Sequence, residues 1–180
     1  CREAMRLCVV GFGFIGASVA AAIRARDSAA QVVAVDRPEA LRHPRVSALS
    51  LSAVDVDDAA LLDRELEAAD LVVLAAPVLV IADQVLPALE RARLVTDCGS
   101  TKRHIAERAA RSDRAGRFVP GHPIAGGSAA GAEAASDGAQ FAGLGFDDPQ
   151  VLFLAEVEVA SLPDLCQYPD WYSCPGTCNR

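Results

Sequence analysis

A single histidine lies in a stretch of residues that favours neither helix nor strand. The sequence VPGHPIAGGSAAG, at residues 119–131, places His122 between a glycine and Pro123. Proline interrupts regular elements because it has no backbone N–H to donate, so a loop is predicted here. An imidazole can accept a proton near neutral pH, which makes His122 a candidate general base. His43, in a charged loop, and His104, in a charged helix, are weaker candidates.

A second polar stretch, TDCGSTK, ends a run of apolar residues that is typical of a strand. It presents Ser100, Thr101 and Lys102 in succession, and Lys102 is the only lysine among the 17 lysine and arginine residues. Its ammonium group is a compact cation that could serve a binding site. The alternative is that Ser100 caps the next helix, with Lys102 in the first turn.

The sequence GFGFIG, which starts at Gly11, follows an apolar run and precedes an alanine-rich stretch. This context favours a dinucleotide-binding turn over a glycine turn without a ligand. Gly11 permits the tight turn, Gly13 lets a pyrophosphate approach the backbone, and Gly16 lets the helix pack closely on the strand. The helix N-terminus, with the N–H groups of Phe14 and Ile15, would bind the pyrophosphate.

Two further strand ends carry residues that suit a dinucleotide. Asp36 ends the run QVVAVD, and an acid about 20 residues after the glycine turn accepts hydrogen bonds from ribose hydroxyls. It would repel a 2′-phosphate and thus favours NAD, although Arg37 beside it could accommodate that phosphate, so NADP stays open. Ala76 and Pro77 end the run LVVLAAP and form either an apolar floor for the cofactor or a simple turn.

Strand-like and helix-like stretches alternate along the chain. Strands are predicted at residues 5–10, 31–36, 71–76, 93–98 and 117–120, and helices at 17–26, 59–70, 81–92, 102–112 and 129–136. Residues 46–58 are ambiguous, with room for a minor strand, and Pro87 predicts a kink or a break in its helix. The alternation predicts an α/β fold with a doubly wound, mostly parallel sheet. Because ligands bind at the carboxyl ends of such strands, the candidate residues should share one edge.

Composition narrows the possible partners and the cellular location. The chain has 180 residues and a net charge of −7, which argues against nucleic acid because phosphate backbones need a basic face. No apolar run reaches the roughly 20 residues of a membrane span, and the N-terminus has no secretory signal, so we expect a cytoplasmic protein. Met5 is the only methionine, and we interpret residues 1–4 as lying upstream of the natural start.

The six cysteines form no disulfide framework in this interpretation. Cys8 and Cys98 lie in strand-like runs, where we expect them to be small buried hydrophobic residues. The C-terminal group lacks a C-x-x-C pair and a nearby histidine, so no metal site is predicted. This group consists of Cys166, Cys174 and Cys178.

Taken in order, these motifs resemble the prephenate dehydrogenase family, which includes the arogenate and cyclohexadienyl dehydrogenases. The resemblance covers about residues 5–143, and the stretches HPIAG and DCGSTK discriminate it from other Rossmann-type oxidoreductases. A β-hydroxyacid dehydrogenase is disfavoured, since it would use a lysine from a second domain. The resemblance implies a Rossmann-type domain that uses NAD in tyrosine biosynthesis.

The resemblance also implies roles for individual residues. His122 would accept the proton of the prephenate ring hydroxyl as hydride leaves the same carbon for NAD. Ser100 would orient the imidazole and touch the same hydroxyl, and loss of carbon dioxide would then give 4-hydroxyphenylpyruvate. Thr101, Lys102 and Gly126 would contact the substrate.

Two departures from the family pattern leave alternatives open. Family members carry an acidic residue shortly after HPxAG, where this chain has Gly127 and Ser128, so prephenate and arogenate both remain candidate substrates. The family also continues into a helical domain that forms the homodimer, and the sequence after Gly143 does not match it. We interpret residues 5–143 as the nucleotide-binding domain and 144–180 as a divergent tail, disordered or produced by a frameshift. Such a truncated chain could be a dehydrogenase with impaired activity, or it could be a catalytically silent NAD-binding module.

Overall fold

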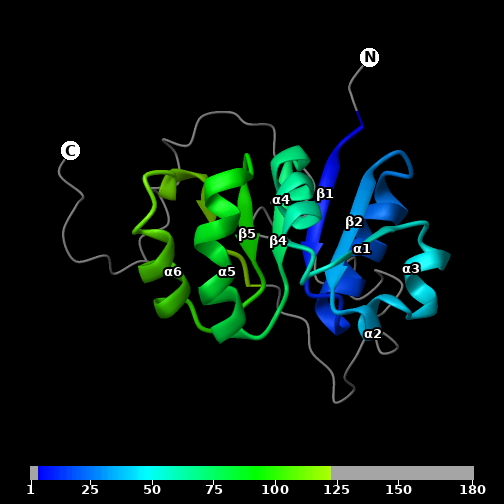
Figure 1. Cartoon of the computed structure of the whole chain (residues 1–180), viewed down its shortest axis with the longest axis horizontal. Helices are drawn as coiled ribbons and strands as arrows, with labels where there is room; N and C mark the ends of the chain where they lie inside the picture. Colours follow the sequence, from blue (N-terminus) through cyan, green and yellow to red (C-terminus); the bar gives the residue numbers. More distant parts are fainter. Residues whose placement is uncertain (1–3, 123–180) are drawn as a thin grey trace.

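The structure, a computed structural model that describes residues 4–122, contains one six-stranded sheet (Figure 1). The strands are β1 (Arg6–Val10), β2 (Gln31–Asp36), β3 (Ser52–Asp55), β4 (Leu71–Leu74), β5 (Val95–Asp97) and β6 (Phe118–Val119). Their order is β3-β2-β1-β4-β5-β6, and every neighbouring pair is parallel. The chain therefore winds outward from β1 in both directions, which confirms the predicted Rossmann-type, doubly wound sheet.

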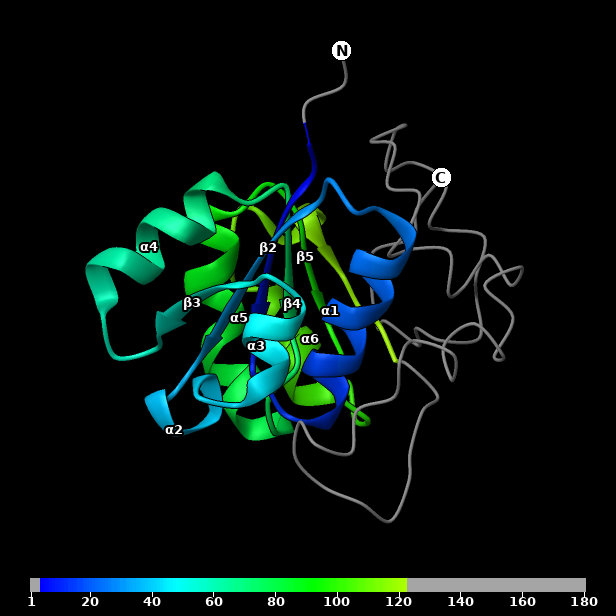
Figure 2. The same cartoon turned by 90° about the vertical axis from the view of Figure 1, so that its right-hand side faces the viewer.

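Helices cover both faces of the sheet. They are α1 (Phe14–Arg26), α2 (Pro38–Leu41), α3 (Pro44–Ala48), α4 (Ala59–Ala68), α5 (Val78–Arg91) and α6 (Arg103–Ala109), with a short 3₁₀ helix at Ala115–Arg117. Figure 2 shows α1 on one side of the strands and α4 and α5 on the other. Leu7 and Val9 of β1 pack with α1, whereas Cys8 and Val10 pack with α4, α5 and α6. A parallel strand buried on both faces reads as a continuous apolar run, which is what β1 shows.

The structure settles two points that the sequence left open. Residues 46–58 contain the minor strand β3, which pairs with β2 at the edge of the sheet. A break at Pro87 is wrong, because α5 continues from Val78 to Arg91 with Pro87 inside it. Proline removes one backbone hydrogen bond, and the fully buried Val85 and Leu89 on either side hold the helix against the sheet.

Several predictions fall outside the described residues and stay predictions. They are the helix at 129–136, the domain boundary at residue 143, the tail at 144–180 and the state of Cys166, Cys174 and Cys178. Within residues 4–122, no helix has both the length and the apolar character that crossing a membrane requires.

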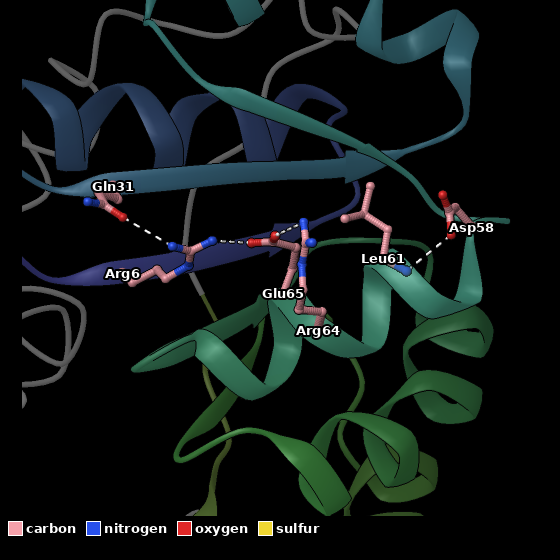
Figure 3. A network of polar contacts seen from close by, with 6 residues as sticks. All are labelled: Arg6, Gln31, Asp58, Leu61, Arg64 and Glu65. Atoms are coloured by element: carbon pink, nitrogen blue, oxygen red, sulfur yellow. Dashed lines mark hydrogen bonds and ion pairs between the residues drawn. The ribbon is translucent and has the colours of Figure 1, made fainter.

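A polar network ties β1, β2 and α4 together at the amino ends of the strands (Figure 3). Glu65 of α4 is only 6% exposed, and its carboxylate accepts hydrogen bonds from the guanidinium groups of Arg6 and Arg64. Arg6 also donates to Gln31 Oε1 at 3.2 Å, which brings in β2. Asp58 caps α4 by accepting from the Leu61 N–H at 3.1 Å.

Arg6 is the main cause of a lowered pKa of the Glu65 carboxyl. Burial raises the pKa of the Glu65 carboxyl, but the hydrogen bond and charge of Arg6, helped by Arg64, more than offset burial and leave the pKa below its ordinary value. A lowered folded-state pKa stabilises the fold above the carboxyl's unfolded pKa, and this contribution is lost as the pH falls through the folded-state value.

Substitution Glu65→Gln should lower the free energy of unfolding at neutral pH by about 1–3 kcal/mol, because Arg6 loses its charged partner. The difference from wild type should shrink as the pH falls through the lowered pKa of Glu65. Urea denaturation followed by circular dichroism at neutral and acidic pH measures both effects. Asp83→Asn, which breaks the exposed Asp83–Arg108 pair, is the control and should cost at most about 1 kcal/mol. Equal effects of the two substitutions would contradict the assignment.

Cys8 and Cys98 are buried and free, which confirms their predicted role as small hydrophobic residues. Burial raises the pKa of both thiols to about 12. The thiolate is the reactive form, so both side chains should be inert in the folded protein.

Iodoacetamide at mildly alkaline pH should therefore leave Cys8 and Cys98 unmodified in the native chain and alkylate both in urea. Peptide mass mapping separates the two from the other cysteines. Modification of either residue in the native chain at the rate of a free thiol would contradict the burial described here.

Candidate functional site

Close backbone contacts require glycine at two positions of the turn after β1. Gly11 has φ +99°, its N–H donates to Val35 O at 2.8 Å, and an added Cβ would lie 2.7 Å from the carbonyl carbon of Ala75. An added Cβ at Gly16 would lie 1.9 Å from Gly11 O. Gly11 and Gly16 therefore let the turn contact α1 on one side and the end of β4 on the other.

Gly13 differs from these two glycines, because an added Cβ would meet nothing within 4 Å. It precedes the first turn of α1, where no side chain caps the helix and no acidic residue is present. The first-turn residues Phe14 and Ile15 are half-buried. Open space beside an uncapped helix N-terminus fits a dinucleotide pyrophosphate, since the first N–H groups of a helix have no partner within it.

Asp36, at the carboxyl end of β2, holds the glycine turn in place. Its Oδ2 accepts from the Phe12 N–H at 2.6 Å, and its Oδ1 accepts from the Arg37 N–H at 2.7 Å. An ionised carboxylate has about four acceptor positions, so Asp36 retains capacity for ribose hydroxyls. The side chain of Arg37 is exposed at the same position. Sequence reasoning selected Asp36 but missed its bond to Phe12, which depends on the shape of the turn.

The end of β4 lies directly beside the glycine turn. Ala75 N donates to Val10 O at 2.7 Å, and the following Ala76 is half-buried. Pro77 is exposed and precedes the first residue of α5. Strands β1 and β4 are neighbours on either side of the point where the strand order reverses, which is where α/β sheets of this kind bind ligands.

The ends of β5 and β6 are joined through Asp97, whose side chain is fully buried. Asp97 Oδ2 accepts from the Gly99 N–H at 2.8 Å and from Lys102 Nζ at 2.5 Å. Asp97 Oδ1 accepts from the Gly121 N–H at 3.3 Å, and Lys102 Nζ also donates to Gly121 O. Asp97 lies in the TDCGSTK stretch but is not among the predicted site residues, although an acid at the end of a buried strand needs a partner.

His122 follows Gly121 and is exposed, as are Ser100 and Thr101 in the loop after β5. Helix α6 begins at Arg103 with Lys102 as its N-cap and without a side-chain cap, so the alternative in which Ser100 caps the helix is wrong. No hydrogen bond joins Ser100 to His122 within residues 4–122.

The predicted residues fall into two groups at the carboxyl edge. The glycine turn binds the carboxylate of Asp36 and is in backbone contact with the residues that follow β4. Lys102 and His122 form the other group, joined through Gly121. Cys98 N donates to Leu74 O at 2.9 Å and so links the ends of β4 and β5 between the two groups. The predicted substrate contact Gly126 lies outside the described residues.

A family model and curated relatives identify the family of this chain. Residues 19–142 match the family described as prephenate dehydrogenase, nucleotide-binding domain. A prephenate dehydrogenase of Bacillus subtilis is 31% identical over 134 residues, which cover 72% of this chain and 35% of that protein.

Solved structures of two other enzymes are similar in sequence and fold. The A. aeolicus prephenate dehydrogenase, in complex with hydroxyphenyl propionate and NAD⁺, aligns with a TM-score of 0.63 and 26% identity over 74% of this chain and 46% of that one. The Synechocystis arogenate dehydrogenase aligns with a TM-score of 0.60 and 30% identity over 73% of this chain and 45% of that one. In all three comparisons the match spans less than half of the relative. The glycine turn, the parallel sheet and these matches together show that the chain belongs to the prephenate dehydrogenase family, as its nucleotide-binding domain.

Proposed function

We propose that this chain binds NAD at the glycine turn and contributes to the oxidative decarboxylation of prephenate in tyrosine biosynthesis. The observation that supports this most is the joining of β5 and β6 through Asp97, which places His122 at the same edge as the turn. The open space beside Gly13 supports a dinucleotide, and the free acceptor positions of Asp36 favour a ribose without a 2′-phosphate, hence NAD rather than NADP.

In this proposal NAD, when bound, supplies the hydride acceptor. His122 Nε2 or Nδ1 accepts the proton of the substrate's ring hydroxyl, while Ser100 orients the imidazole and touches the same hydroxyl. The hydroxyl-bearing carbon gives up its hydride to that acceptor and becomes a ketone. The bond to the ring carboxylate then breaks with loss of carbon dioxide, its electron pair moves into the ring, and the resulting phenolate oxygen takes back the proton held by His122, which gives the aromatic 4-hydroxyphenylpyruvate. The exposure of both side chains leaves them accessible to a substrate at this edge. Substrate contacts of Thr101, Lys102 and Gly126, and a cytoplasmic location, stay predictions.

Two other functions are alternatives to this proposal. Arogenate stays a candidate substrate, because the chain is 30% identical to the Synechocystis arogenate dehydrogenase and has Gly127 and Ser128 at the place of the family's acid. A catalytically silent NAD-binding module is the second alternative. NADH fluorescence and NADH formation from prephenate or arogenate separate the three: binding without turnover supports the module, and the higher kcat/KM identifies the substrate.

Substitution of Gly13 and Gly16 by alanine should separate cofactor binding from folding. Gly13→Ala should keep the free energy of unfolding within about 1 kcal/mol of wild type, because its Cβ meets open space, and should weaken NADH binding about tenfold or more by blocking the pyrophosphate. Gly16→Ala should destabilise the fold by about 1–3 kcal/mol or more, since its Cβ would overlap Gly11 O. Urea denaturation and NADH fluorescence measure the two effects. Unchanged NADH affinity in Gly13→Ala would show that the glycine turn does not bind the cofactor.

Substitution His122→Asn should leave NADH affinity nearly unchanged and lower prephenate turnover by about 100-fold or more, because the proton acceptor is lost. His104→Asn is the control, since His104 is an exposed residue of α6, and it should keep wild-type turnover. The rate of NADH formation at saturating prephenate measures the difference. Equal turnover in His122→Asn and wild type would exclude His122 from the mechanism.

A further inference from the structure

A buried carboxylate lies at the carboxyl edge, next to the proposed catalytic loop. The Asp97 side chain has no exposed surface, and burying a charge without a partner is costly. Its partner is Lys102, whose side chain is 23% exposed and whose ammonium lies 2.5 Å from Asp97 Oδ2. The mechanism proposed above assigns no task to Asp97.

Both residues of this pair also bind the peptide groups of Gly121, the residue before His122. Asp97 accepts from the Gly121 N–H, and Lys102 donates to the Gly121 carbonyl oxygen. The backbone of Gly121 is also pressed against β5, because an added Cβ would lie 2.6 Å from Asp97 O and 3.0 Å from Thr96 Oγ1. Gly121 is therefore held on its N–H, its carbonyl and its Cα.

The same pair fixes the loop that carries Ser100. Asp97 accepts from the Gly99 N–H, and Lys102 stands two residues after Ser100 as the N-cap of α6. One ion pair thus contacts the chain on both sides of Ser100 and directly before His122. Side chains on two separate loops can act on one hydroxyl group only if both backbones are fixed relative to each other.

We propose that Asp97 and Lys102 are positioning residues, which hold the backbones of Ser100 and His122 in register for the reaction. The inference rests on the proposed function for the roles of Ser100 and His122. It also gives Lys102 a task other than substrate binding, since two of the three ammonium donors are used within the chain.

The test compares wild type with Asp97→Asn and with the double variant Asp97→Ala/Lys102→Met. Lys102→Met alone would leave a buried carboxylate without a partner and could unfold the chain, whereas the double variant removes both charges. Arg108→Met is the matched control, because it removes a cation of the same helix whose partner, Asp83, is exposed. Circular dichroism establishes that each variant is folded.

The first measurement is amide hydrogen exchange by NMR. In the double variant, the Gly121 amide should exchange about tenfold faster or more, because its acceptor on Asp97 is removed, while amides of β1 keep wild-type protection. Asp97→Asn retains an acceptor for the Gly121 N–H and should fall between the double variant and wild type. Unchanged exchange at Gly121 in the double variant would overturn the inference.

The second measurement is steady-state oxidation of prephenate at saturating NAD. The double variant should lose about tenfold to 100-fold in kcat, with KM for prephenate and NADH affinity within about threefold of wild type. A raised KM with unchanged kcat would overturn the inference and assign Lys102 to substrate binding. Absence of turnover in the wild-type chain counts against the proposed function, and the exchange measurement then decides the inference alone.

Discussion

Contact of backbone with backbone at the carboxyl edge is the constraint on which the site depends. At Gly11, Gly16 and Gly121 an added Cβ would lie 2.7, 1.9 and 2.6 Å from atoms of a neighbouring segment. Side chains at these positions would push the strand-end segments apart, and the polar groups on different loops would no longer keep their relative positions. Glycine is required at these three positions because the neighbouring atoms leave no room for a Cβ. Of the three, only Gly11 also has a left-handed backbone, which favours glycine by itself.

Two buried carboxylates, one at each edge of the sheet, bind different kinds of partner. At the amino ends, Glu65 binds the guanidinium of Arg6 and joins a helix to the first strand. At the carboxyl ends, Asp97 binds backbone N–H groups as well as the ammonium of Lys102. The first pair connects two side chains and stabilises the scaffold. The second pair controls main-chain positions, which is why we associate it with function.

The sequence predicted the architecture well, because parallel strands buried on both faces leave continuous apolar runs and the glycine turn has a fixed spacing. It also placed Asp36 and His122 at the ends of strands. It could not reveal that Asp36 binds Phe12 or that Asp97 binds Gly121, since those partners are backbone groups brought close only by folding. The continuity of α5 through Pro87 was also hidden, because packing of Val85 and Leu89 outweighs the lost hydrogen bond.

Asp36 holds the glycine turn and is also the proposed ribose ligand, and these two roles constrain how this chain could evolve a different coenzyme preference. Its carboxylate holds the amide of Phe12, a residue only 1% exposed, so the acid is part of the scaffold as well as of the proposed ribose site. A replacement without a side-chain acceptor, such as alanine or glycine, would leave that amide without a partner. A change toward NADP by such a replacement would therefore pass through a less stable intermediate, whereas asparagine or serine would keep an acceptor for the Phe12 N–H.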